Sequence, residues 1–184
     1  MPVSEQTFRQ LAWEDPEGQW ELECGRPRQK PAMTADHNRT ATYLGALLIT
    51  QLDRSQFEVR VNSGHVRRSE TNYYIPDVIV IPRAMVRPFD GRADLLEVYT
   101  RPLPLVVEVW SPSTGDYDQD SKLPEYQRRG DREIWRIHPF DRTLTAWRRQ
   151  PNGSYTEMLY TGGTVQPVAL PGVTIDLKSL FERE

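Results

Sequence analysis

The sequence has one cysteine, few lysines and no excess of either charge among its 184 residues. A single cysteine, Cys24, cannot form an internal disulfide, so a disulfide-stapled fold is excluded and we expect a free thiol in the core. Lys and Arg total 23 against 26 Asp and Glu, a net charge of -3, so the molecule as a whole does not attract polyphosphate. Charge therefore has to be considered locally.

Long apolar runs and a secretion signal are also missing. The longest apolar stretch, residues 44–49, is far shorter than the roughly 20 residues that span a bilayer. No cationic stretch followed by an apolar core opens the chain, and we expect a cytoplasmic protein without a membrane partner. The length and composition predict one domain over residues 1–184. A domain of this size buries roughly 70% of its unfolded surface, so a bound metal would serve function rather than folding.

Arginines gather in residues 123–149, where seven arginines stand against four acids. Two interpretations remain open for this segment. It is either a surface that contacts phosphates or, more commonly for such a composition, an ordinary solvated face of mixed charge.

Hydrophobic periodicity predicts a mixed order of helices and strands. Helices are predicted over residues 4–11 and 34–52 and in a segment that ends before Gly130, after an acidic loop at 116–120. Alternation predicts strands over 20–24, 57–61, 65–69, 133–138, 143–148 and 154–160, with a turn at 62–64 that joins two of them in a hairpin. Apolar runs at 78–81 and 105–107 predict interior strands. This order favours the α/β class, with a mixed central β-sheet flanked by α-helices.

Two acids stand at or inside the predicted interior strands. Asp77 opens the first apolar run after Pro76, and Glu108 interrupts the second. If the strands are neighbours and the carboxylates lie about 4 Å apart, their repulsion is about 4 kcal/mol at an effective dielectric near 20. A shared proton, a basic side chain or a divalent cation would offset it, and hard oxygen ligands suit Mg²⁺ or Mn²⁺.

Only three lysines are present, and Lys122 stands at the start of the helix that follows Glu108. From there its ammonium group can reach back over the strand end and stabilise an anionic transition state. Purely structural roles are equally open from the residues: a strand-entry cap for Asp77, an ion pair with an arginine for Glu108, and a solvated side chain for Lys122.

These residues belong to a longer pattern that strongly resembles the Uma-type putative restriction endonuclease family, a bacterial branch of the PD-(D/E)XK nuclease superfamily. The matching segments are Trp20–Leu22 with Gly25, His37, Pro76–Val80, Leu105–Thr114, Asp118, Lys122, Tyr126, Gly130, Glu133–Trp135 and Leu170–Gly172. They cover nearly the whole chain. The resemblance implies a restriction-endonuclease-like core with an acidic metal site at one end of the central strands.

The resemblance also implies roles for individual residues. Asp77 and Glu108, with the backbone carbonyl of Val109, would ligate Mg²⁺ or Mn²⁺, and Lys122 would be the catalytic lysine. Plainer members of the superfamily have that lysine two residues after the glutamate, where this chain has Trp110. The supporting positions would be Glu21, His37, Asp118 and Tyr126. The implied activity is metal-dependent hydrolysis of phosphodiester bonds in DNA, for which a homodimer would suit cleavage of both strands.

Three positions depart from the family pattern. Cys24 and Arg26 stand where relatives usually have acids, and Pro124 falls inside the helix that bears Lys122, where it can shift the lysine relative to Glu108. The alternative function is therefore a catalytically decayed nuclease-fold module that binds nucleic acid or protein partners. A hydrolase of another phosphate ester would use the same residues.

Two further groups of residues are candidates for a functional site. Four tyrosines near predicted loops are candidates for stacking on unpaired bases, with core packing as the alternative: Tyr73, Tyr74, Tyr99 and Tyr117. Ser111, Ser113 and Thr114 have no histidine at motif spacing, so we expect a structural loop rather than a nucleophile. No zinc-ligand spacing is present either.

Overall fold

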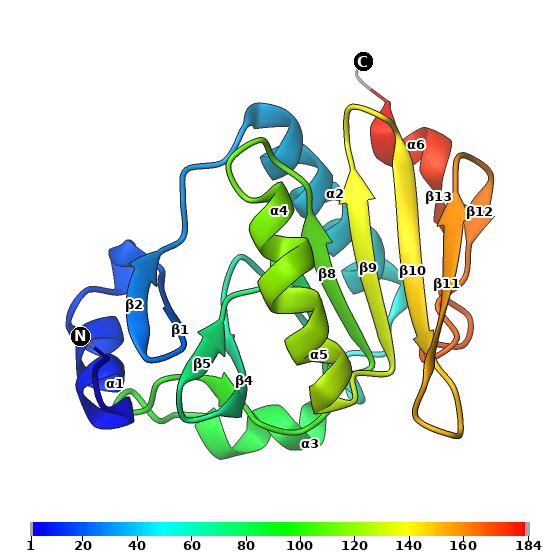
Figure 1. The fold of residues 1–184 in the computed structure, drawn as a ribbon. Helices are drawn as coiled ribbons and strands as arrows, with labels where there is room; N and C mark the ends of the chain where they lie inside the picture. The colour runs from blue at the N-terminus through cyan, green and yellow to red at the C-terminus, as the bar shows by residue number, and fades with distance from the viewer. Residues whose placement is uncertain (1, 183–184) are drawn as a thin grey trace.

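Helices cover both faces of a central six-stranded sheet in the structure, a computed structural model that describes residues 2–182 (Figure 1). The strand order is β11-β10-β9-β8-β6-β3. The bounds are β3 (Phe57–Val61), β6 (Val78–Pro82), β8 (Leu105–Val109), β9 (Glu133–His138), β10 (Thr143–Arg149) and β11 (Tyr155–Tyr160). Only β8 and β9 pair in parallel, so the sheet is mixed. The predicted α/β class is confirmed, and every residue of β8 is buried, as expected for an interior strand.

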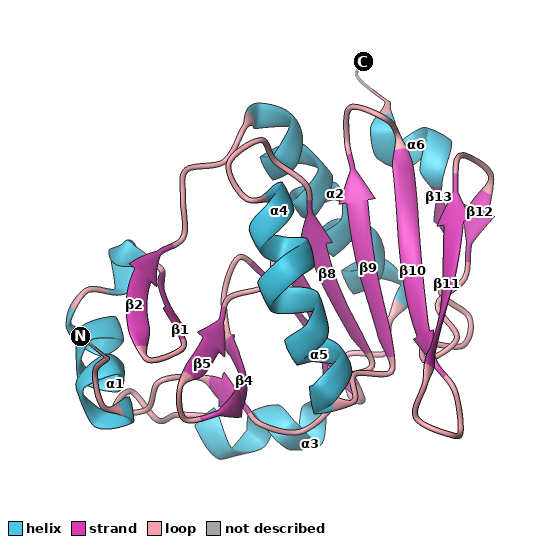
Figure 2. Cartoon of the chain, viewed as in Figure 1, coloured by secondary structure: helices cyan, strands magenta, loops and turns pink. Residues whose placement is uncertain are grey.

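A smaller sheet lies beside the N-terminal helix (Figure 2). Its order is β2-β1-β5-β4-β7, from β1 (Trp20–Glu23), β2 (Arg26–Gln29), β4 (His65–Ser69), β5 (Asn72–Tyr74) and β7 (Val98–Tyr99). A two-stranded pair, β12 (Thr164–Val165) and β13 (Ile175–Asp176), follows near the C-terminus.

The predicted hairpin between residues 57–61 and 65–69 is wrong, although both strands exist. β3 pairs with β6 in the central sheet, whereas β4 pairs with β5 and β7 in the smaller one. Asn62 and Gly64, with φ of 49° and 76°, redirect the chain between the two sheets. Asn62 N–H then donates to Asp77 O and His65 N–H to Glu97 O, so each strand has a different partner.

The helices begin where capping residues stand. α1 (Glu5–Glu14) is capped by Ser4 and α2 (Ala35–Gln51) by Thr34, whose side chains accept hydrogen bonds from Thr7 N–H and His37 N–H. α2 and α6 (Leu177–Phe181) pack on one face of the central sheet. α3 (Arg83–Val86) and α5 (Leu123–Arg129) pack on the other, and Figure 1 shows α5 in front of the sheet and α2 behind it. Two short 3₁₀ turns, η1 (Pro16–Gly18) and η2 (Arg87–Phe89), complete the connections.

The stretch expected to be an acidic loop is helical instead. α4 (Gly115–Tyr117) runs into a π turn, η3 (Asp118–Lys122), and then into α5. Leu123 N–H donates to Asp118 O, a five-residue step that widens the helix just before Pro124. A regular helix would bring the proline ring against the carbonyl four residues back, so the wide turn lies where the helix adapts to Pro124.

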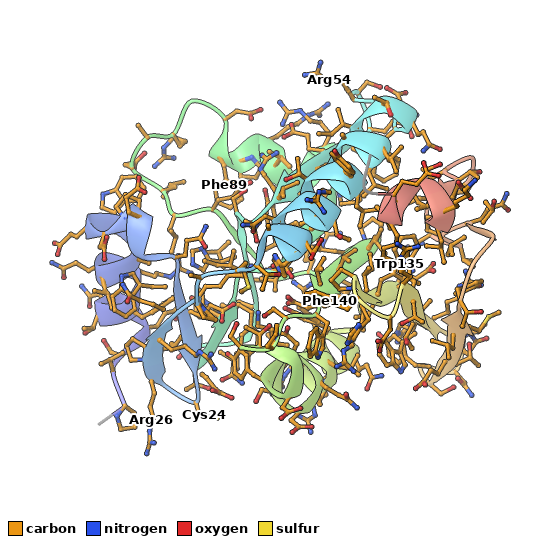
Figure 3. All side chains as sticks on the ribbon, turned by 90° about the horizontal axis from the view of Figure 1, so that it is seen from above. Cys24, Arg26, Arg54, Phe89, Trp135 and Phe140 are labelled. Atoms are coloured by element: carbon orange, nitrogen blue, oxygen red, sulfur yellow. The ribbon has the colours of Figure 1, made fainter. Side chains whose placement is uncertain are left out.

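Cys24 is exposed, so the expected core thiol is wrong. The chain reverses from β1 to β2 at Cys24 and Gly25, with φ of 48° and 77°, and this turn directs the cysteine outwards. Figure 3 shows Cys24 and Arg26 at the outer margin of the molecule. Within residues 2–182, no helix combines the length and the apolar character needed to cross a membrane.

Replacing Gly130 with alanine is expected to lower stability by about 1–2 kcal/mol, because this glycine ends α5 with a φ of 86° that alanine adopts only under strain. At about 2–4 °C per kcal/mol for a chain of this size, the melting temperature should fall by roughly 2–8 °C. Gly162→Ala is the control, because its added Cβ meets no atom within 4 Å. Equal melting temperatures for the two variants would contradict this account.

Candidate active site

The two acids of the interior strands lie opposite each other at one end of the central sheet. β6 and β8 are antiparallel neighbours, and Val78 opposite Val107 places Asp77 beside Glu108 in the same register. Asp77 N–H donates to Val107 O, which fixes Asp77 at the start of β6. Both side chains are buried, with Asp77 1% and Glu108 4% exposed. Both acids are buried, as the apolar runs beside them predict, and the two strands are neighbours.

Asp77 is held by three donors. Lys30 Nζ lies 2.6 Å from Oδ1, while His37 Nε2 and Val109 N–H lie 2.9 Å and 2.7 Å from Oδ2. Lys30 also donates to Asn62 Oδ1 and to Ile75 O, each at 2.9 Å. Burial alone would raise the pKa of Asp77, but Lys30 and His37 hold it well below its usual range. Asp77 is therefore an ionised carboxylate fixed in position.

Lys122 lies at the centre of a second group of acids. Its Nζ is 2.9 Å from Glu21 Oε1, 3.3 Å from Glu108 Oε1 and 3.4 Å from Asp118 Oδ1. The lysine is 1% exposed, so a solvated helix-end lysine is excluded. The π turn places Asp118 and Lys122 on the same side as the strand ends, and Pro124 does not prevent Lys122 from reaching Glu108.

Burial and like charges act together on this second group. Burial would lower the pKa of Lys122, but Glu108, Glu21 and Asp118 hold it well above its usual value. Burial raises the pKa of Glu108 and of Asp118, and neighbouring carboxylates raise both further against the attraction of Lys122. Tyr126 donates to Glu108 Oε1 at 2.5 Å and orients it.

The donor set suits a divalent cation in its chemistry. Four buried carboxylates, Glu21, Asp77, Glu108 and Asp118, lie around the ammonium groups of Lys30 and Lys122. When all four are ionised they exceed these two ammonium groups by two charges, which Mg²⁺ or Mn²⁺ would offset. Glu21 Oε2 and Asp118 Oδ1 are buried and accept no hydrogen bond from the described residues. Within residues 2–182, however, no three acid, histidine or cysteine side chains are already arranged to hold a metal ion.

Trp110 occupies the position where plainer members of the superfamily have the lysine, and its indole packs away from the acids. The ring stacks on His138 with centroids 4.2 Å apart. A Cβ added to Gly115 would lie 2.1 Å from Trp110 Nε1, so the absence of a side chain at the start of α4 makes room for the indole. Trp110 thus helps to set where the helix with Lys122 begins.

The sequence predicted eight site residues, and the structure brings seven of their side chains and the backbone of Val109 together: Glu21, His37, Asp77, Glu108, Val109, Asp118, Lys122 and Tyr126. It did not predict Lys30, which follows β2 and binds Asp77, or Asn62, whose side-chain oxygen in the turn after β3 accepts a hydrogen bond from Lys30. The scarcity of lysine was the available signal, because it makes each buried lysine unusual.

The tyrosines proposed for base stacking are largely core residues. Tyr73, Tyr74 and Tyr99 are buried, so of the two alternatives the structure supports core packing for these three. Tyr117 is half-buried, and the guanidinium of Arg28 lies 3.6 Å from its ring centroid. This contact joins the smaller sheet to α4 over the acidic group.

The arginine-rich segment divides between internal ion pairs and surface. Arg129 is buried and binds Asp131, and Arg148 binds Glu133. Arg128, Arg132 and Arg149 line a cavity of about 490 Å³ at the end of α5. The segment is therefore not one uniform phosphate-contacting face.

Replacing Glu108 with glutamine is expected to stabilise the cation-free protein at neutral pH. The pKa of Glu108 lies well above the value of 4.5 usual for glutamate, so its ionised form costs stability, and glutamine mimics the protonated form. We therefore expect a higher melting temperature for the variant than for the wild type near pH 8. The difference should shrink as the pH falls below the folded pKa of Glu108 and vanish near the unfolded value of about 4.5. A variant less stable than the wild type at pH 8 would contradict this assignment.

Comparison with known proteins relates the chain to a protein family and to solved structures. Residues 5–178 match the Uma2 family, described as "Putative restriction endonuclease". A putative nuclease belonging to DUF820 from Anabaena variabilis has a similar crystal structure, with a TM-score of 0.79, 16% identity and 98% of each chain covered. At this identity the likeness concerns the fold alone. No curated protein matches the chain.

Proposed function

Because the chain belongs to the Uma2 family of restriction-endonuclease-like proteins, we propose that it is a metal-dependent endonuclease that hydrolyses phosphodiester bonds in DNA. The observation that carries the proposal is the set of buried carboxylates around Lys122 Nζ, at the end of the interior strands. Burying such charge is costly for a fold and is typical of a site that acts on an ionic substrate.

Asp77 and Glu108, with the carbonyl of Val109, would hold Mg²⁺ or Mn²⁺, and Asp118 and Glu21 each offer a buried oxygen that accepts no hydrogen bond from the described residues. When bound, such a cation polarises the scissile phosphate and lowers the pKa of a water molecule. Lys122 carries a fixed positive charge, because three carboxylates keep it protonated. That ammonium group stabilises the negative charge that develops on the phosphoryl oxygens during hydrolysis.

The remaining residues position these groups. His37 and Lys30 fix both oxygens of Asp77, and Tyr126 fixes one oxygen of Glu108. Such contacts orient ligands and set their charge, and losing one typically costs about 10–100-fold in metal affinity or activity. In this proposal His37, Lys30 and Tyr126 are positioning residues that do not contact the substrate.

A non-catalytic module that binds nucleic acid or protein partners is the second candidate. The burial of the site favours it, because Asp77, Glu108 and Lys122 are each less than 5% exposed and both oxygens of Asp77 are already bound by donors. In a nuclease, substrate and cation binding would have to open this arrangement.

A plasmid-nicking assay with Mg²⁺ or Mn²⁺ tests the proposal. We expect nicking by the wild type and a loss of at least about 100-fold in Glu108→Gln, since this substitution removes a proposed ligand rather than an outer contact. Glu125→Gln is the matched control, because Glu125 is a buried acid of α5 that pairs with Arg68 and Arg128 outside the site. Cation-independent nicking, or equal nicking by both variants, would refute the proposed activity.

A further inference from the structure

One edge of the central sheet is open along β3. β3 is the last strand in the sheet order, and no strand within residues 2–182 pairs with its outer side. A cavity of about 760 Å³ lies beside it, lined by residues from the end of α2, from β3 and from the start of α3. Figure 3 shows Arg54, just before β3, at the outer margin of the molecule. Natural sheets usually block such an edge with a proline, a bulge or a covering element.

The backbone groups of β3 alternate between the two sides of the strand. Asn62 N–H donates to Asp77 O and Gln56 O accepts from Arg83 N–H, in the same register as the β3–β6 pairs. Even-numbered residues therefore bond to β6, and Val59 and Val61 direct their N–H and C=O groups to the open edge. Arg60 of the same chain donates a long hydrogen bond of 3.4 Å to Val59 O, which the strand of a second copy would replace. Phe57 N–H is bonded to Asp53 O, so Phe57 offers only its carbonyl there.

The side chains of β3 are arranged symmetrically around Val59. Glu58 precedes it and Arg60 follows it, with Phe57 and Val61 beyond them. Within one chain Arg60 binds Glu58 and Glu97, and Glu58 also binds Arg83, so pairing with a second copy would extend this charged network. If a second copy pairs antiparallel with Val59 opposite Val59, then Glu58 lies opposite the copy's Arg60, and Phe57 opposite its Val61. If the two-fold axis passed one residue earlier or later along β3, Glu58 would lie opposite Glu58 of the second copy, or Arg60 opposite its Arg60. Charge thus selects one register.

The apolar side of this edge suits the same arrangement. Phe57, Val59 and Val61 are half-buried against α2, and Ile49 near the end of α2 is 49% exposed. Ile49, Leu52, Phe57 and Val59 all line the cavity, so they offer an apolar surface that continues past the strand. In an antiparallel pair the same surface of a second copy would lie beside it.

The opposite edge of the sheet lacks this symmetry. Among the described strands β11 pairs with β10 alone. The hydrogen bond from Gln150 N–H to Ser154 O shows that the odd-numbered residues of β11 direct their backbone groups outwards. Self-pairing around the outward Glu157 would place that glutamate opposite itself. Self-pairing around Val59 of β3 therefore brings opposite charges together, whereas self-pairing around Glu157 of β11 brings like charges together.

We propose that β3 is the interface of a two-fold homodimer, in which the β3 strands of two copies pair antiparallel around Val59 and join their central sheets. Two Val59 N–H groups donate to the opposing Val59 carbonyls, and two Glu58–Arg60 pairs flank them. The proposal does not depend on nuclease activity.

Sedimentation at micromolar concentrations tests it with a charge exchange. Glu58→Arg and Arg60→Glu should each weaken dimerisation at least about tenfold, because each substitution creates two like-charged pairs across the interface. A mixture of the two single variants restores opposite charges between the copies and should form heterodimers. Melting curves of each variant establish that it is folded.

A proline pair provides the second arm. Val59→Pro removes the outward N–H without touching the bonds to β6 and should give a monomer, whereas Leu159→Pro, at an outward position of β11, should leave the dimer intact. A wild type that sediments as a monomer at these concentrations would overturn the proposal. So would a dimer that persists in folded Val59→Pro.

Discussion

Lys122→Met is expected to reduce cation-dependent nicking by about 10²–10³-fold, the range found when one preorganised charge or donor to a transition state is removed. Methionine retains the length of the side chain but leaves Glu21, Glu108 and Asp118 without their shared ammonium group. Cation affinity should be kept or increased, because the site loses a positive charge. Nicking and calorimetric titration on the same samples separate the two effects.

Lys178→Met is the matched control for this substitution, because Lys178 is an exposed lysine of α6 far from the acids in sequence. It should nick at the wild-type rate. The Lys122→Met protein should melt at a lower temperature without cation and gain more from added Mn²⁺ than the wild type does. Full nicking by Lys122→Met would remove this lysine from the mechanism.

Asp77→Ala is expected to have the largest effect on stability. The substitution leaves the buried ammonium of Lys30 without its carboxylate and Val109 N–H without an acceptor. Removing one partner of a buried ion pair typically costs about 3–5 kcal/mol. The melting temperature should therefore fall by roughly 6–20 °C, as measured by thermal unfolding.

A double-mutant cycle with Lys30→Met isolates the ion pair. If Lys30 and Asp77 act on each other as the 2.6 Å contact indicates, the double variant should be more stable than Asp77→Ala alone. Additive losses from the two single variants would mean that the pair contributes no coupling. Because Asp77→Ala also destabilises the fold, a loss of activity in that variant alone does not separate an effect on folding from an effect on catalysis.

The paired acids were predictable because their cost is visible in the sequence. Asp77 and Glu108 interrupt apolar runs that only interior strands produce, and antiparallel pairing of those strands then brings the acids together. Lys30 was not predictable in the same way, because it precedes Asp77 by 47 residues and reaches it only when the smaller sheet packs beside the central one.

Strand partners and the helix path also depended on tertiary structure. Alternation identifies β3 and β4 as strands, but the turn at Asn62 and Gly64 sends them to different sheets. The acidic residues before Lys122 suggested a loop, yet two of them contribute to a π turn whose charge is offset by Lys122. The Asp118–Lys122 pair is local, but Lys122 also pairs with Glu21 of β1, which local sequence does not report.

Calorimetric titration of Mn²⁺ into the wild type and Glu108→Gln tests the central claim, that this acidic group binds a divalent cation. The glutamine variant is expected to be at least as stable as the wild type, so a loss of binding cannot be attributed to unfolding. The account predicts a saturable site in the wild type that is lost, or weakened by at least about 100-fold, in the variant. A folded wild type that binds neither Mn²⁺ nor Mg²⁺ would contradict it and favour the non-catalytic module.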